Sequence, residues 1–291
     1  MKHWRTRMNN NRIRYVFAVL ALFVHQYATA QVFSNGMSAL DKVNVYKVVT
    51  FEEFIHRFNN DVKSNIRMAY RFYKVEFKVR RPALIRSLFD YETKAWDTAM
   101  ISNFATAAID TRKVAFLDQG ANLLAEAVCR FRYGSADIEV PVVLHYISDP
   151  EKGSKWVIVG VGHHPLSLKE VTLPVIKEKA VLRFINPVNN EANFTELSRV
   201  FDDKENLQDY FDHALFLKPR FGAFYNAVLN SELQFLYVKE IRYHALQYEN
   251  WIFTVKEFRR NTLNSGWLIS KLLRVNTPEE KNNYIKTLMG E

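Results

Sequence analysis

Cysteine is almost absent from this sequence: its 291 residues include one cysteine, Cys129, beside 9 glycines and 8 prolines. A single cysteine excludes an intrachain disulfide, and the chain has no CxxC pair for redox chemistry or zinc. Cys129 lies in the alternating apolar stretch LLAEAVCRFRY, which predicts a small core residue rather than a nucleophile. The chain also lacks HExxH, GxSxG and a glycine-rich phosphate loop, so the common zinc proteases, serine hydrolases and nucleotide-binding proteins are not indicated.

The apolar run at the N-terminus is short. YVFAVLALFV covers residues 15–24, follows Arg12 and Arg14, and precedes the small residues Ala28 to Ala30. A membrane-spanning helix needs about 20 apolar residues, so this pattern predicts a cleaved secretory signal over residues 1–30. We therefore expect an exported protein, periplasmic or extracellular, with no stable membrane span after cleavage.

Positive charge is concentrated in the predicted signal. The chain has 40 Lys and Arg against 31 Asp and Glu, and residues 1–30 hold five of the bases and no acid, which leaves 35 bases against 31 acids. The remaining bases alternate with acids apart from short runs such as KVRR (78–81) and EFRR (257–260), which we interpret as solvated faces. A nucleic-acid partner is not expected, since it normally requires a clustered basic surface.

Two stretches predict capped aromatic helices at the start of two similar halves. In TFEEFIHRFNND (50–61), Thr50 and Glu53 fit a capping box, and the aromatic positions recur with helical spacing. In NFTELSRVFDDK (193–204), Asn193 is predicted to cap in the same way. The positions that match at one fixed offset are Phe51, Phe54 and Phe58 with Phe194, Leu197 and Phe201.

Alternating strands follow each helical region. LLAEAVCRFRY, DIEVPVVLHYI and WVIVGVG form the first set, while ELQFLYVKEIRYHAL, NWIFTVKEFRR and GWLISKLLRV form the second. Trp156 and Trp267 each open the last strand of a set after a small polar turn. The repeated order indicates a divergent duplication, and Thr277 with Pro278 and Glu280 predicts a short terminal helix.

The segments FEEFIHRFN with KWVIVGVG, and FTELSRVFD with GWLISKLL, make the chain resemble the NTF2-like (cystatin-like α+β cone) superfamily in an exported bacterial protein. The resemblance implies an α+β fold of two tandem NTF2-like domains, each with N-terminal helices packed on a curved antiparallel sheet. The implied boundaries are an arm at 31–47, a first domain at 48–165, a linker at 166–191, and a second domain at 192–291 that includes the C-terminal helix. In that family the cone mouth can hold a small molecule, support proton-transfer catalysis or be filled by side chains, so the fold alone does not indicate an activity.

Three residues are the candidates for ligand binding. Trp96 and Asp97 place an aromatic ring beside a carboxylate, and core or rim packing is the alternative role for both. His145 could be a general base at the cone mouth, or part of an exposed cross-strand ladder opposite Glu126 or Arg130. The adjacent His163 and His164 would point to opposite strand faces, so no metal site is expected.

Two short patterns indicate modification only weakly. Asp97, Thr98 and Ala99 resemble an O-glycosylation pattern of some exported bacterial proteins, and Asn193 to Thr195 satisfies the N-glycosylation pattern.

The favoured hypothesis is a non-enzymatic binding or interaction protein whose partner is a small apolar ligand or an envelope protein, with no cofactor. The alternatives are an isomerase- or hydrolase-type enzyme with an acid or base in one cone, and a structural subunit of a cell-envelope assembly that pairs through exposed edge strands.

Overall fold

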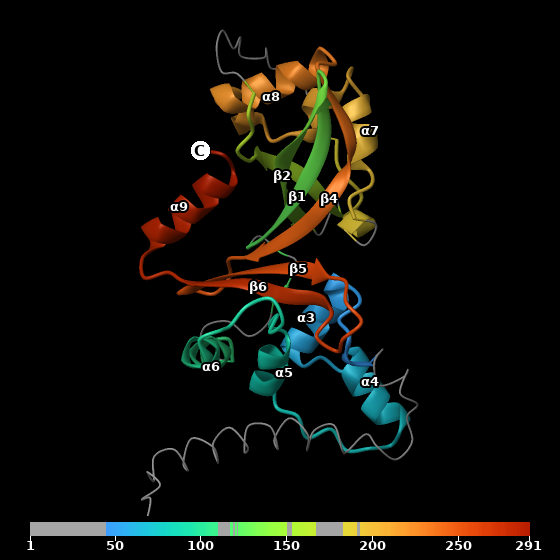
Figure 1. Cartoon of the computed structure of the whole chain (residues 1–291), viewed down its shortest axis with the longest axis vertical. Helices are drawn as coiled ribbons and strands as arrows, with labels where there is room; N and C mark the ends of the chain where they lie inside the picture. The colour runs from blue at the N-terminus through green and yellow to red at the C-terminus, as the bar shows by residue number, and fades with distance from the viewer. Residues whose placement is uncertain are drawn as a thin grey trace, which may run out of the picture.

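The computed structural model describes residues 45–109, 117–118, 120, 122–149, 153–166, 183–190 and 193–291. The fold is α+β, as expected, and the described strands form one six-stranded antiparallel sheet with the order β3-β2-β1-β4-β5-β6. Long strands β1, β2 and β4 rise through the molecule, and β5 and β6 cross them at a wide angle at one end (Figure 1).

The helices fall into two groups separated by the first three strands in the chain. The α-helices are α3 (Phe51–Asn59), α4 (Asn65–Phe72), α5 (Arg81–Ser87), α6 (Thr98–Ala107), α7 (Leu197–Asp202), α8 (Pro219–Leu229) and α9 (Pro278–Leu288). Short 3-10 helices are η1 (Pro187–Asn190), η2 (Leu207–Tyr210) and η3 (His213–Leu217).

The strands lie where the alternating patterns predict them. They are β1 (Leu123–Tyr133), β2 (Ala136–Asp149), β3 (Gly153–Val161), β4 (Leu233–Ala245), β5 (Trp251–Phe258) and β6 (Gly266–Arg274). The two sets meet where β1 pairs with β4 along its whole length, from Leu123 opposite Ala245 to Tyr133 opposite Leu233. Both sets therefore belong to one sheet.

The helices of the first half pack on strands of the second half. Phe58 of α3 stacks on Phe253 of β5 with ring centroids 5.5 Å apart, and Phe51 stacks on Tyr243 of β4 at 3.6 Å. At the outer strand β6, Val48 bridges to Gly266 and Phe89 bridges to Ile269. Figure 1 shows α3, α5 and α6 beside β5 and β6.

The second half makes the equivalent contacts with the first. Phe194 meets Trp156 of β3 edge-on at 5.2 Å, and Phe201 meets Phe131 of β1 at the same centroid distance. At the outer strand β3, Ile185 bridges to Trp156, while Phe211 bridges to Ile158. Ile158 and Ile269 each lie two residues after the tryptophan that begins the strand core, so the matching positions of the two halves have matching surroundings.

This exchange differs from the expected packing of each helical group on the strands that follow it. The physical reason is the β1–β4 pairing, which joins two three-stranded sets into one surface. Helix α3 therefore packs on β4 and β5 of the second set, and α7 lies over the junction, where Phe201 contacts both Phe131 of β1 and Phe235 of its own strand β4. Most buried residues of both halves accordingly belong to one continuous cluster beneath these helices. The boundaries at 48–165 and 192–291, and the membership of the NTF2-like superfamily, stay predictions.

Helix starts follow the sequence at two of three predicted caps. Thr50 Oγ1 accepts a hydrogen bond from the Glu53 backbone at 3.0 Å, and Thr277 does the same for Glu280 at 3.2 Å. The predicted cap at Asn193 is wrong, because Asn193 and Phe194 adopt left-handed backbone angles (both φ 52°) in a turn, and α7 begins later, at Leu197. Phe194 still reaches the core and is fully buried.

Helix α9 covers the other face of the sheet. Its Tyr284, Ile285, Leu288 and Met289 pack against a separate cluster that includes Leu124, Val143 and Ile252. Gly160 of β3 permits this approach, because an added Cβ would lie 3.1 Å from the Met289 backbone. Among the described residues, none of the helices is long and apolar enough to cross a membrane.

The predicted signal at 1–30 lies outside the described residues. So do most of the predicted arm (31–47) and most of the linker (166–191).

Candidate functional site

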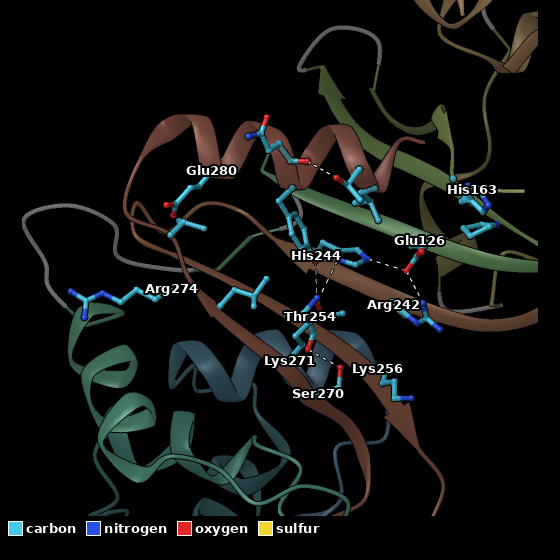
Figure 2. A pocket seen from close by; sticks show the side chains of 18 of the residues that line it. Glu126, His163, Arg242, His244, Thr254, Lys256, Ser270, Lys271, Arg274 and Glu280 are labelled. Carbon is cyan, nitrogen blue, oxygen red and sulfur yellow. Dashed lines mark hydrogen bonds and ion pairs between the residues drawn. The ribbon is translucent and has the colours of Figure 1, made fainter. Parts of the chain in front are cut away.

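A large cavity lies between α9 and the sheet face that the other helices leave uncovered. Its volume is about 1020 Å³. Strands β1, β4, β5 and β6 form its floor, and α9 forms one wall (Figure 2). We call this cavity the α9 groove.

Strand register brings the polar side chains of the groove together. Glu126 of β1 lies opposite Arg242 of β4, and His244 of β4 lies opposite Thr254 of β5. Residues two apart on a strand share a face, so Arg242 and His244 both point to the side that α9 covers. Figure 2 shows His244 between Glu126 and Thr254.

His244 is held by protein groups through both ring nitrogens. Nε2 lies 3.2 Å from Glu126 Oε2, and Nδ1 lies 2.7 Å from the Tyr284 hydroxyl and 3.4 Å from Thr254 Oγ1. Because the carboxylate can only accept, Nε2 donates to it, and in the neutral ring Nδ1 accepts from Tyr284. His244, Glu126 and Thr254 are buried.

Charge and burial act in opposite directions on Glu126. Burial acts to raise the pKa of its carboxyl, but the hydrogen bond and charge of His244, together with Arg242, hold that pKa below its ordinary value. Arg242 Nη1 donates to Glu126 Oε2 at 3.2 Å. Burial raises the pKa of the Tyr284 hydroxyl, which therefore stays protonated at neutral pH. The network is thus an ionised carboxylate satisfied by an imidazole and a guanidinium, with a neutral phenol closing it.

Basic side chains dominate the rim of the groove. The bases are Lys94, Arg242, Lys256, Lys271 and Arg274, and the acids are Glu126 and Glu280. Arg242 and Lys256 already form ion pairs with Glu240. Lys271 and Arg274 are exposed and form no ion pair with an acid in the described part of the chain. Lys271 instead lies over the Tyr284 ring, and Arg274 lies over the Trp251 ring. Lys94 likewise forms no ion pair with an acid among the described residues, so three rim cations, of which Lys271 and Arg274 are neighbours on β6, remain for an incoming anion.

Trp96 and Asp97 have local structural contacts and lie apart from the network. Trp96 Nε1 donates to the Asp90 carbonyl at 2.5 Å, and its ring meets Phe89 edge-on at 4.9 Å. Asp97 caps α6 by accepting from the Ala99 backbone at 2.8 Å. Lys94, whose ammonium lies 4.0 Å from the Trp96 ring centroid, links this region to the groove rim.

His145 lies on the other side of α9 from the network. It faces Leu124 across the β1–β2 pair rather than Glu126 or Arg130, and lines a second cavity of about 520 Å³ with Leu246 and Met289. The expected cross-strand ladder exists without it, since Arg130 donates to Glu139 at 2.6 Å. The three predicted ligand residues therefore do not share one cavity.

The adjacent histidines follow β3, which ends at Val161, so the expected strand positions do not apply to them. His163 lines the α9 groove, whereas His164 is buried with Nε2 3.1 Å from the Arg220 carbonyl.

The network residues were missed from the sequence, although a signal for them exists. Glu240, Arg242 and His244 alternate along β4, and Thr254 with Lys256 alternates along β5. When the residues on one face of a strand are polar and those on the opposite face are apolar, the polar face either is exposed to solvent or forms a functional site. Tyr284, which closes the network, gives no such signal, because a lone tyrosine in a polar terminal helix is also typical of simple packing.

Within the described residues there is no group of three or more His, Cys, Asp or Glu side chains that could hold a metal ion. Cys129 is fully buried, and burial raises the pKa of its thiol, so it lies in the core as predicted. No family model, curated protein or solved structure matches this chain.

Proposed function

We propose that this chain is an exported, non-enzymatic binding protein whose α9 groove holds a small amphipathic anion. The observation that carries the proposal is the pair Lys271 and Arg274, two exposed cations without an acidic partner among the described residues, at the rim of a cavity of about 1020 Å³. Pockets for small molecules are commonly about 300–1,000 Å³. The cations would take the anionic head.

The groove offers apolar surface for the rest of such a ligand. Leu273, Val275 and Leu288 line it beside the basic residues. Beneath the helices on the other face of the sheet, the described part of the chain fills the interior with large side chains such as Phe58, Phe131 and Trp156, all fully buried. Ligand binding is therefore assigned to the α9 side rather than to an apolar cone beneath the helices.

The enzyme alternative has one specific observation in its favour, the buried His244 beside Glu126. Both imidazole nitrogens are occupied by protein groups, however, so neither faces a substrate in this arrangement. The Tyr284 hydroxyl, which lies against Nδ1, is a poor base near neutral pH because burial raises its pKa. The contacts favour a structural network that holds the groove wall.

The envelope-subunit alternative depended on exposed edge strands. Both outer strands carry bridges from other segments, from Val48 and Phe89 on β6 and from Ile185 and Phe211 on β3. These bridges occupy backbone groups that a partner strand would need, so they argue against assembly through those positions.

Titration calorimetry with dodecyl phosphate, below its critical micelle concentration, tests the proposal. We expect saturable binding, and a decrease in affinity of about tenfold or more for the double variant Lys271→Glu/Arg274→Glu, since each reversal replaces attraction by repulsion. The matched control is Arg199→Glu on α7, whose side chain is 64% exposed. Dodecyl maltoside, which has the same alkyl chain but an uncharged head group, tests whether binding requires the negative charge of the ligand.

Binding of dodecyl phosphate that is unchanged in the double variant, or equal binding of dodecyl maltoside, would overturn the proposal. Turnover of a supplied ester or ketone that is lost in His244→Gln would support the enzyme instead.

A further inference from the structure

An apolar ridge stands on the surface of helix α4. Phe72 is 78% exposed, Met68 48% and Val75 36%. Met68 and Phe72 are four residues apart and share one helical face, and Val75 follows in the turn after α4. Figure 1 places α4 at the opposite end of the molecule from α7 and α8.

This ridge is not needed for the local core. The opposite side of α4 buries Ile66 and Tyr70 against Leu84, and Phe77 folds back to meet Tyr70 edge-on at 4.9 Å. The Phe72 ring meets the ring of its neighbour Tyr73, with the two centroids 5.1 Å apart. A helix that is already anchored by its opposite side thus exposes large apolar side chains to solvent. Exposed apolar patches of this kind are typical of interaction surfaces.

Positive charge surrounds the ridge. Residues 62–80 contain six Lys and Arg against one acid, Glu76, a net charge of +5 in a chain whose total is +9. Glu76 is already paired with Lys78 at 3.0 Å. Arg71 and Lys74 are exposed beside Phe72. The exposed bases next to the ridge are therefore Arg71 and Lys74, within a stretch of the chain that carries a net positive charge.

Lys74 lies just after α4, which ends at Phe72 with Tyr73 as its C-cap. It adopts the left-handed conformation (φ 53°), and its backbone N–H donates to the Arg71 carbonyl at 3.1 Å. This turn places the exposed Lys74 side chain close in the chain to Phe72 and Val75 of the apolar ridge.

The N-terminal part of the chain enters the described structure next to this surface. Val45 and Tyr46 pack against the same small cluster that anchors α4, and Arg57 fixes the segment by donating to the Tyr46 carbonyl at 2.7 Å. The predicted signal at 1–30 takes no part in this surface, because its cleavage would remove it from the mature chain.

From these observations we infer that the α4 surface binds the face of a lipid bilayer that contains anionic headgroups. Met68, Phe72 and Val75 enter the boundary between headgroups and acyl chains, while Arg71 and Lys74 contact lipid phosphates. Basic residues flanking exposed aromatic and aliphatic side chains are the composition that favours interfacial binding. Such docking is peripheral.

A polarity-sensitive label at Met68→Cys gives the direct test. Cys129 is the only cysteine of the chain and is fully buried, so the new thiol is the one accessible to the reagent. With the full chain, we expect the label to show a blue shift and increased fluorescence with vesicles of phosphatidylcholine and phosphatidylglycerol, and little change with phosphatidylcholine alone. The matched control is Leu217→Cys, at a residue 73% exposed on η3.

Cosedimentation of the unlabelled chain with the same vesicles measures affinity. We expect the double variant Arg71→Glu/Lys74→Glu to bind at least about tenfold more weakly than the wild type, since each basic residue near an anionic surface contributes about 1 kcal/mol. Phe72→Ala should also weaken binding by about tenfold, because it removes the largest apolar side chain of the ridge. Leu217→Ala and Arg199→Glu should bind like the wild type. The inference would be overturned if the label at position 68 did not respond to the vesicles, or if the α4 variants bound as tightly as the wild type. Either result would mean that another segment carries the protein to the membrane or that α4 is covered by a protein partner.

Discussion

The two faces of the sheet are built from different chemistry. On the face covered by α3 to α8, aromatic rings from both halves interlock, as in the contacts of Phe58 with Phe253 and of Phe131 with Phe201. On the α9 face, strand residues at the alternate positions are largely polar, and α9 itself has no fully buried residue. One face therefore supplies most of the apolar burial, and the other keeps an open groove.

The difference separates stability from binding. Close-packed interiors leave few voids larger than a water molecule, so the aromatic face has no room for a ligand. The α9 face has room because the helix rests on a small cluster beside the cavity and not across it. The largest effects of substitution on stability should therefore belong to the aromatic face.

Phe58→Ala tests the aromatic face. The Phe58 ring contacts Phe54, Phe104, Tyr248 and Phe253, so its loss leaves a cavity shared by α3 and β5. We expect the free energy of unfolding to fall by about 3–5 kcal/mol, measured by urea denaturation. Phe201→Ala, at the matching position of the second half, should cost a similar amount.

Leu217→Ala is the control for that pair. Leu217 is 73% exposed, and its truncation should change stability by less than about 0.5 kcal/mol. A cost below about 1 kcal/mol for Phe58→Ala, or a large difference between Phe58→Ala and Phe201→Ala, would contradict the equivalence of the two halves.

Much of the aromatic face could be predicted from the sequence. Amphipathic spacing in 50–61 and 193–204 identified residues that are buried, and strand alternation identified all six described strands. These signals are local, because a side chain's face depends only on its position within one element. Which strands the helices cover is not local: it depends on the β1–β4 pairing, between segments about a hundred residues apart, so the exchange of helices between halves could not be read from either half.

The α9 face was less predictable for the same reason. Glu126 and His244 lie 118 positions apart and meet only through the strand order of the sheet. His145, which the sequence singled out, lies on the correct face but on the far side of α9. Parity along a strand predicts the face of a residue, whereas its neighbours across strands require the register.

Glu126→Gln tests the buried network. The amide keeps the shape of the side chain but removes the charge that pairs with His244 and Arg242. We expect a loss of about 1.5–3 kcal/mol in the free energy of unfolding, the range for a hydrogen bond to a charged group. The control is Glu139→Gln on β2, whose more exposed carboxylate pairs with Arg130 and Lys239 and should contribute much less. Equal effects of the two substitutions would remove the distinction between a buried and an exposed network.

The pH dependence of stability sharpens the same comparison. The pKa of Glu126 is lower in the folded protein than its ordinary value, so the unfolded chain binds its proton more readily. The stabilisation is therefore complete above the unfolded value, about 4.3, and is lost as pH falls through the lower folded value. In urea titrations, the free energy of unfolding of the wild type should exceed that of Glu126→Gln by a constant difference from neutral pH to about pH 5. This difference should shrink below about pH 4. A margin that grows on acidification would show that the carboxylate is not ionised in the folded state.

Tyr284→Phe has the smallest expected effect and isolates α9 from the rest of the fold. The substitution removes the hydroxyl that lies 2.7 Å from His244 Nδ1 but keeps the ring against the sheet. We expect a loss of about 1 kcal/mol, seen in hydrogen exchange as weaker protection of the α9 amides while β1 and β4 keep theirs. Tyr237→Phe, at a residue 54% exposed on β4, is the control and should leave both sets unchanged. If the exchange of β1 and β4 rises together with that of α9, the helix is part of the cooperative core, and the two faces of the sheet do not differ in the way their packing indicates.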